Sequence, residues 1–212
     1  MTLIFASNNA HKLEEARAIL SGHHILSLAE IGLHEEIPET QPTLQGNSLQ
    51  KAEFVYNWCQ QHTNSLPADV IGCFADDTGL EIEALNGDPG VYTARWAGDH
   101  CNPADNRKKT LTLLEGVTNR QAQFRTVVTF IPFHRGTPSA FEGIVHGNPS
   151  AYEGIVRGSI STEERGNGGF GYDPVFIPEG YDKTFAELPI ELKNSISHRA
   201  RAMKKFADSL TK

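Results

Sequence analysis

Val70-Ile-Gly-Cys-Phe-Ala75 is an unbroken apolar run that ends in Asp76-Asp77-Thr78-Gly79. Because hydrophobicity does not alternate along the run, the pattern predicts a strand that is buried on both faces. The next residues, Leu80–Leu85, do alternate and predict a half-exposed strand. A similar short apolar run predicts another buried strand at Leu3–Ala6. The chain is therefore expected to fold around a sheet with buried strands.

Amphipathic patterns on both sides of this run predict helices. Lys12–Leu20 follows the polar turn Ser7–His11, and Asn8 or Asn9 is suited to cap its first turn. Residues 21–46 are expected to be rich in loops. Three more helices are expected, from about Asn47 to Gln61, from Asn102-Pro-Ala-Asp105 to Glu115, and from Ser197 to about Leu210.

The second half of the chain is rich in strand patterns. Strands are expected at Gln121–Phe133, 141–146 and 152–157, and at Val175–Ile177 after the glycine-rich stretch Gly166–Pro174. Strands and helices mix without a strict βαβ alternation, so we expect a mixed-sheet α/β or α+β fold rather than a doubly wound one. No linker-like segment divides the chain, which predicts a single domain over residues 1–212.

Composition and charge exclude several classes of protein. Lys and Arg number 19 against 26 Asp and Glu, for a net charge of −7, so the chain lacks the basic footprint of a nucleic-acid binder. The apolar start Met1–Ala6 is too short for a signal peptide, and no run approaches the roughly 18 residues of a membrane span. The three cysteines form no CxxC pair, which favours a reducing compartment. We therefore expect a cytoplasmic protein with neither nucleic acid nor membrane as its partner.

The turn Ser7-Asn-Asn-Ala-His-Lys12 lies between a predicted strand and a predicted helix. Backbone N–H groups and the helix N-terminus favour an anion there, and Lys12 adds a full positive charge. The glycines of a Walker loop are missing. The turn therefore predicts a phosphate site, and an ordinary capped turn remains the alternative interpretation.

Two adjacent carboxylates, Asp76 and Asp77, follow directly after the buried strand. Burial of carboxylates is costly unless they bind a cation or cap a turn. Successive strand residues face opposite sides, so only one of the two is expected to point into a site. Glu39 could supply a second oxygen ligand. The alternatives are an Asx-turn that opens Thr78-Gly79 and, for Glu39, a solvated surface acid.

Two further groups of residues could bind a flat, charged ligand. Phe170-Gly-Tyr-Asp173 could stack on a base, with Asp173 at the edge of the base. Lys193 precedes Ser197-His198-Arg199, and these side chains could converge on one ligand. For the Phe170–Asp173 loop, the alternative is a tight turn whose aromatic rings pack in the core. For Lys193, His198 and Arg199, the alternative is ordinary surface charge.

Taken together, these pieces resemble the inosine/xanthosine triphosphate pyrophosphatase family over nearly the whole chain. Five motifs in the same order make a chance resemblance very unlikely. The matching segments are Ser7-x-Asn9-x-x-Lys12, Ala75-Asp-Asp-Thr-Gly-Leu80, Pro89-Gly-Val-Tyr-Thr-Ala-Arg-Trp-Ala-Gly98, Gly169-Phe-Gly-Tyr-Asp-Pro174 and Lys193-x-x-x-Ser-His-Arg199.

The resemblance implies a Mg²⁺-dependent hydrolase that converts ITP, dITP and XTP to the monophosphate and pyrophosphate. It also implies a long mixed sheet with two lobes around a central nucleotide-binding groove, and a homodimer. Asp77 would be the catalytic acid/base and would share the metal with Glu39. By position, the triphosphate would be held by Ser7, Asn8, Asn9, Ala10, His11 and Lys12, and the nucleotide would be contacted by Thr78, Phe170, Gly171, Tyr172, Asp173, Lys193, His198 and Arg199.

Hydrogen-bond logic suggests how such a site would choose its base. Hypoxanthine and xanthine present a 6-oxo acceptor where adenine presents an amino donor, so donors at Arg199 and His198 would reject adenine. Two other functions remain open. One is a pyrophosphatase for another modified nucleotide, such as a modified pyrimidine or 7-methylguanosine triphosphate. The other is a nucleotide-binding protein without turnover.

A tandem duplication stands outside the resemblance. Residues 140–150 and 151–161 are identical at seven of eleven positions and look like two copies of one strand. The first copy ends in the turn sequence Gly147-Asn-Pro-Ser150, whereas the second continues as Ser159-Ile-Ser161, which can stay extended. We expect the second copy to lie in the sheet and the first to protrude as an excursion.

Overall fold

The computed structural model describes residues 1–135 and 144–211, without the side chains of residues 134–146. These residues form two compact units. The first unit comprises Met1–Asp77, Val127–Glu153 and Ala202–Lys212, and the second comprises Thr78–Thr126 and Gly154–Arg201. Three strands and one helix pass from one unit into the other, and the first crossing falls between Asp77 and Thr78.

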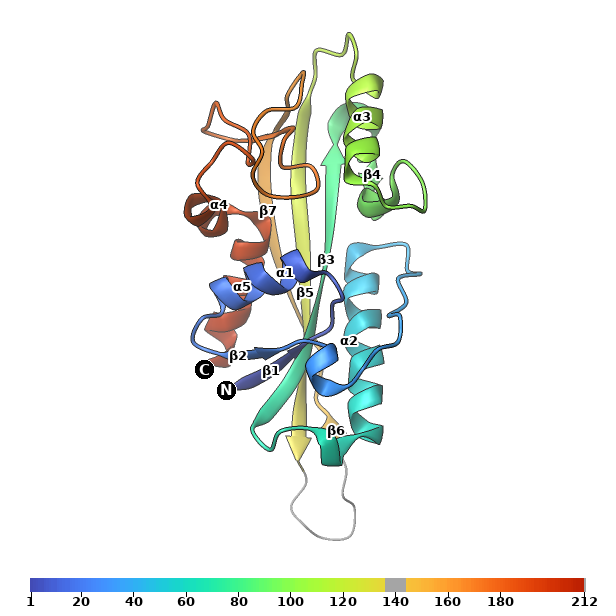
Figure 1. Ribbon diagram of the computed structural model, residues 1–212, viewed down its shortest axis with the longest axis vertical. Coiled ribbons are helices and arrows are strands. Elements are labelled where there is room, and N and C mark those ends of the chain that lie inside the picture. Colours follow the sequence, from blue (N-terminus) through green and yellow to red (C-terminus); the bar gives the residue numbers. More distant parts are fainter. Residues whose placement is uncertain (136–143, 212) are drawn as a thin grey trace. The chain divides into compact units, whose positions relative to one another are not determined.

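The strands form a mixed sheet, as the sequence predicted (Figure 1). In the first unit, β1 (Thr2–Phe5) pairs in parallel with β2 (His24–Leu26) on one side and with the start of β3 (Val70–Ile82) on the other. Later pairings are antiparallel, such as β4 on β3 and β8 on β7. The order is β2-β1-β3-β5-β7-β8, with β4 (Pro89–Gly90), β5 (Gln121–Arg135), β6 (Ile144–His146), β7 (Ser150–Ile160) and β8 (Phe176–Pro178).

Helices cover both faces of the sheet in the first unit. On one face, α2 (Leu44–Gln61) packs against Cys73 and Ala75 of β3. On the other face, α1 (Ala10–Ile19) and the end of α5 (His198–Leu210) pack in a cluster that contains Phe74. This alternation along β3 explains why its apolar run is unbroken, since both faces are buried.

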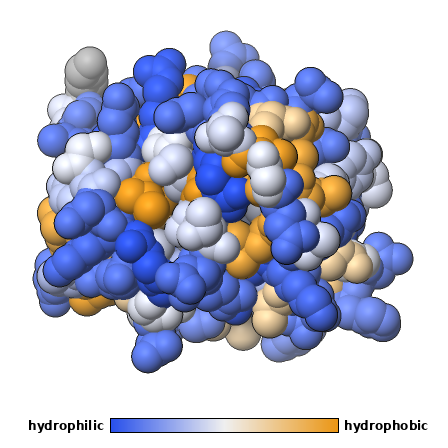
Figure 2. Space-filling model, turned by 90° about the horizontal axis from the view of Figure 1, so that it is seen from above, coloured by the Kyte–Doolittle hydropathy of each residue, from blue (hydrophilic) through white to orange (hydrophobic). Residues whose placement is uncertain are grey.

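The second unit has a core of its own, built from the far ends of the strands. Its helices include α3 (Pro103–Leu113) and α4 (Ile190–Ile196), and it has short 3₁₀ turns at Glu83–Leu85 and Thr93–Arg95. The first unit has similar 3₁₀ turns at Ala29–Ile31 and Thr63–Ser65. The surface at the end of the view where α3 lies is mostly hydrophilic, with apolar residues in small separate groups (Figure 2). Among the described residues, no helix is both long and apolar enough to cross a bilayer. The core residues include Leu80, Ile82, Phe124, Val156, Phe176 and Phe185.

Local capping signals were read correctly from the sequence. The Asn9 side chain accepts a hydrogen bond from the Lys12 backbone N–H, and Asn102 caps α3 in the same way. Ser197 Oγ accepts a hydrogen bond from the backbone N–H of Ala200 at the start of α5. Each of these caps satisfies an amide that the first turn of a helix leaves without a partner.

The observed elements differ from the expected ones at three places. The residues Asp76–Gly79 do not turn but continue one strand, β3, because each aspartate is neutralised by a lysine. Residues 21–46 are rich in loops, as expected, but they also contain β2 and the start of α2, which begins at Leu44 rather than at about Asn47. The short helix α4 was missed. Its pattern is too brief for a periodicity signal.

The duplicated segment is used in two different ways. The second copy provides most of β7, as expected, and its Val156 side chain is buried while Ile155 is only half-buried. In the first copy, Ile144–His146 pair antiparallel with the end of β5, so the expected excursion is wrong for these residues. Their pairing satisfies backbone groups of Phe133–Arg135. Residues 140–143 lie outside the described part of the chain.

Candidate active site

The turn after β1 presents polar groups next to the N-terminus of α1. The Ser7 hydroxyl accepts a hydrogen bond from the Asn9 backbone N–H at 3.2 Å, and Asn9 in turn caps the helix. Residues 8–11 are exposed, whereas Lys12 is half-buried. The turn thus combines the partial positive charge of a helix N-terminus with an ammonium group, as an anion site requires.

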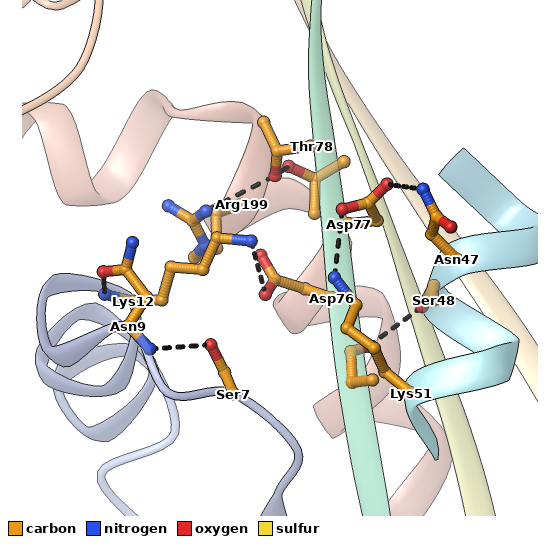
Figure 3. A network of polar contacts seen from close by, with 12 residues as sticks. Ser7, Asn9, Lys12, Asn47, Ser48, Lys51, Asp76, Asp77, Thr78 and Arg199 are labelled. Atoms are coloured by element: carbon orange, nitrogen blue, oxygen red, sulfur yellow. Dashed lines mark hydrogen bonds and ion pairs between the residues drawn. The ribbon is translucent and has the colours of Figure 1, made fainter. Parts of the chain in front are cut away.

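Asp76 and Asp77 point to opposite faces of β3, as strand alternation predicts. Asp76 is fully buried and forms an ion pair with Lys12 at 3.1 Å (Figure 3). Asp77 accepts hydrogen bonds from Lys51 Nζ at 3.0 Å and from Asn47 Nδ2 at 3.3 Å, both on α2. One aspartate therefore holds the lysine of the turn Ser7–Lys12, and the other faces the first turns of α2.

Lys51 brings Glu39 and Asp77 together. Its Nζ donates to Glu39 Oε1 at 2.5 Å and to Asp77 Oδ1 at 3.0 Å, and only 4% of the residue is exposed. The segment that carries Glu39 is held by α2, since the Gln41 backbone N–H donates to Asn47 Oδ1 at 2.8 Å. The two residues expected to share a metal therefore meet in one polar cluster of the first unit.

Burial and charge shift the ionisation of this cluster in opposing ways. Burial raises the pKa of Asp77 above its ordinary value, although Lys51 and Lys12 counteract the shift. Burial would lower the pKa of Lys51, but the carboxylates of Asp77 and Glu39 outweigh it and raise that pKa. Desolvation opposes ionisation of Glu39, yet the ammonium of Lys51 lowers its pKa. The pKa of Asp77 is thus shifted upward by burial, whereas contact with Lys51 shifts the pKa of Glu39 downward.

The sequence interpretation missed Lys51 and Asn47. Both lie on the buried face of α2, where an amphipathic helix carries apolar residues, and Ser48 beside them donates to the Ala75 carbonyl. Polar residues at these core positions are the signal that could have found them. The partner on β3 lies 26 residues away from Lys51, so no local pattern links the two.

The oxygen donors of the cluster fit a small divalent cation. Mg²⁺ is held by one or two carboxylates together with substrate phosphates, rather than by a complete cage of protein ligands. Glu39 and Asp77 supply two such carboxylates, and their shared contact with the Lys51 ammonium shows that this position favours positive charge. No group of three or more His, Cys, Asp or Glu that could hold a metal occurs among the described residues.

In the second unit, the glycine-rich loop holds an aromatic ring next to two cations. The Asp173 carboxylate accepts hydrogen bonds from Lys193 Nζ at 2.6 Å and from the Phe170 backbone N–H at 2.7 Å. Lys193 Nζ lies 4.7 Å from the centre of the Phe170 ring, and Arg199 Cζ lies 5.8 Å from it. At Gly169, φ is +69° and a Cβ would collide with Asp173, so the loop needs glycine there.

The loop residues Gly171 and Tyr172 take part in packing. The Tyr172 side chain lies in the core of the second unit, and its hydroxyl donates to the Thr93 carbonyl at 3.1 Å. Burial raises the pKa of this tyrosine. The Gly171 carbonyl accepts a hydrogen bond from Arg107 at 2.8 Å. The side chain of Tyr172 is thus packed in the core, which was the alternative to a contact with the base.

His198 and Arg199 begin α5 and reach two threonines. The His198 ring stacks on Phe124, with ring centres 4.7 Å apart, and its Nδ1 lies 2.6 Å from Thr126 Oγ1. Arg199 donates to Thr78 Oγ1 at 3.4 Å (Figure 3). The structure therefore brings the expected residues Thr78, His198 and Arg199 together, and adds Thr126, which the sequence did not indicate.

The Ham1 family matches residues 3–209. The chain belongs to the Ham1 family. Proteins named dITP/XTP pyrophosphatase from Porphyromonas gingivalis and Flavobacterium johnsoniae are 50% and 45% identical to this Ham1 chain. The alignment with the Porphyromonas gingivalis protein covers 98% of this chain and 96% of that protein. The alignment with the Flavobacterium johnsoniae protein covers 100% of this chain and 98% of that protein. A solved structure of the Staphylococcus aureus Ham1 protein matches with a TM-score of 0.80 at 32% identity, over 100% of this chain and 98% of that one.

Proposed function

We propose that this Ham1-family chain is a dITP/XTP pyrophosphatase that hydrolyses ITP, dITP and XTP to the monophosphate and pyrophosphate. The observation that carries the proposal is the buried Asp77, held by Lys51 and Asn47 in the same unit as the phosphate turn. Full-length relatives that are 45–50% identical bear this activity in their names, which supports the same reaction.

The first unit would bind the triphosphate and prepare the attacking water. A nucleoside triphosphate brings about four negative charges to a chain of net charge −7, and the turn Ser7–Lys12 would offset them locally. Glu39 and Asp77 would hold Mg²⁺, which when bound offsets the negative charge on the departing pyrophosphate. Asp77 would accept the proton of the water that attacks the α-phosphorus, a role that its raised pKa suits.

The second unit would read the base. Phe170 would stack on the purine, while Lys193 and Arg199, the two cations beside that ring, would bind its polar edge or the phosphates. Donors at His198 and Arg199 would match the 6-oxo group of hypoxanthine or xanthine. They would find no acceptor at the 6-amino group of adenine. Guanine shares the 6-oxo group, so it would have to be rejected at its 2-position. The further expected contacts are Thr78, Gly171, Tyr172 and Asp173.

A panel of nucleoside triphosphates tests the function. With Mg²⁺, we expect pyrophosphate as the first product from ITP, dITP and XTP, and much lower rates with ATP and GTP. Orthophosphate as the first product, or equal rates with ATP, would contradict the proposal. Turnover of a modified pyrimidine or of 7-methylguanosine triphosphate alone would favour a different pyrophosphatase. Binding without any product would favour a nucleotide-binding protein.

Replacing the loop aromatic tests its contact with the base. We expect Phe170→Ala to raise KM for ITP by an amount that corresponds to about 1–3 kcal/mol of lost stacking, with a smaller effect on kcat. Phe170→Trp should keep most of the affinity, because it retains an aromatic face. Initial rates of pyrophosphate release over a range of ITP concentrations measure both constants. An unchanged KM in the alanine variant would show that the ring does not contact the substrate.

Three broader expectations stay predictions. These are the homodimer, the cytoplasmic location and the nucleotide-binding groove between two lobes. Sedimentation of the purified protein would test the first, since a monomer at micromolar concentration would contradict it.

A further inference from the structure

Thr126 is a fully buried hydroxyl that links two residues of the proposed base site. It lies on β5 in the second unit, where its Oγ1 is 2.6 Å from His198 Nδ1 and 2.7 Å from Thr78 Oγ1. Phe124 lies two residues earlier on the same face of the strand and stacks on the His198 ring. One strand therefore sets both the plane of the imidazole and the partner of its Nδ1.

Either hydroxyl of the Thr78–Thr126 pair could donate, and the residue that favours one direction is Arg199, whose side chain can only donate. The Arg199 side chain has no acceptor atom, so Thr78 Oγ1 accepts the hydrogen bond between them. Hydroxyl dipoles beside a fixed cation are most stable when their oxygens face it and their protons point away. In the order that this favours, Thr78 donates to Thr126, and Thr126 donates to His198 Nδ1. This order makes Nδ1 an acceptor.

We propose that Thr126 holds His198 as the neutral tautomer whose proton is on Nε2, and so makes this histidine a donor. The inference rests on the proposed function, because a donor at His198 suits the 6-oxo group of hypoxanthine and xanthine. The opposite tautomer would place the acceptor on Nε2 and suit the 6-amino group of adenine instead. Thr126 is fully buried and acts through His198, so it is a positioning residue for base selection.

The tautomer can be measured without any substrate. Two-bond proton–nitrogen correlation spectra of protein with ¹⁵N-labelled histidine distinguish the two ring nitrogens at about pH 8, above the ordinary histidine pKa. The His198→Gln variant identifies the signals of His198. We expect an unprotonated Nδ1 and a protonated Nε2. A proton on Nδ1, in the neutral ring or in the imidazolium, would overturn the inference even if the enzyme prefers ITP.

Substitutions of Thr126 test the consequence for selectivity. Thr126→Val keeps the shape of the side chain but removes the hydroxyl, and we expect the ratio of kcat/KM for ITP to that for ATP to fall about tenfold. Thr126→Ser should restore both the ratio and the histidine signals. The matched control is Thr129→Val on the same strand, because the buried Thr129 hydroxyl has no hydrogen-bond partner in the described part of the chain.

The outcomes separate this inference from the proposed function. If the wild-type protein does not release pyrophosphate from ITP, the function fails while the tautomer remains measurable. If ITP is hydrolysed selectively and Thr126→Val keeps that selectivity, the positioning role is wrong and the function stands. If Thr126→Val does not fold, the inference is decided by the spectrum of the wild-type protein and by the Thr126→Ser variant.

Discussion

We expect Asp77→Asn to lower kcat for ITP about 100-fold or more, as for the loss of a general base. The amide keeps the size of the side chain but can neither accept the proton of the attacking water nor bind a cation as a charged ligand. Folding should survive, because Lys51 keeps its ion pair with Glu39 at 2.5 Å. Initial rates of pyrophosphate release, together with circular dichroism, measure activity and folding separately.

The neighbouring aspartate provides the critical comparison. Asp76 faces Lys12 on the other side of β3, so Asp76→Asn should act mainly through the turn Ser7–Lys12, the proposed phosphate site, and raise KM. Asp99→Asn, at an exposed position, controls for the loss of one negative charge. If Asp76→Asn lowers kcat strongly and Asp77→Asn has only a mild effect, the general base is Asp76 and our assignment to Asp77 is wrong.

For Lys51→Met we expect a loss of about 3 kcal/mol in the free energy of unfolding and a large loss of activity. Removing one partner of a buried ion pair leaves the other charge uncompensated, which costs roughly 3–5 kcal/mol. The partial exposure of Glu39 favours the lower end of that range. Urea unfolding measures the first effect, and pyrophosphate release measures the second.

The loss of stability in Lys51→Met should depend on pH and on metal. Burial already raises the pKa of Asp77, and without the ammonium that pKa rises further. A carboxyl with a raised folded pKa destabilises the folded state as it ionises, so the loss grows as pH rises above about 4 and shrinks below it. Mg²⁺ should restore part of the stability, because it supplies positive charge to Glu39 and Asp77.

A surface lysine provides the matched control for Lys51→Met. Lys204→Met, at an exposed position of α5, removes the same charge without a buried partner and should leave stability nearly unchanged. Equal losses in the two variants would mean that the buried ion pair contributes nothing. A loss in Lys51→Met that is the same at every pH would exclude the two carboxylates as its cause.

Elements with local signals were predictable from the sequence. The caps Asn9 and Asn102 and the inward face of α2 follow from rules that act within one or two turns of helix. The strand at residues 70–75 was expected from its apolar run alone. The motifs also indicated the family, because the chemistry of phosphate and base recognition requires particular side chains at short spacing.

Contacts between distant segments were decided by the tertiary structure. The continuation of β3 through Asp76 and Asp77 depends on Lys12 and Lys51, which reach the strand from two different helices. Without these partners a pair of buried carboxylates is too costly, so the sequence alone indicated that the strand ends before them. Capping and periodicity are read within a few residues, whereas Thr126 and His198 lie 72 residues apart. The amino-acid sequence therefore determined which groups the protein has for its chemistry, and the packing of distant segments determined their burial, the direction of their pKa shifts and their hydrogen-bond partners.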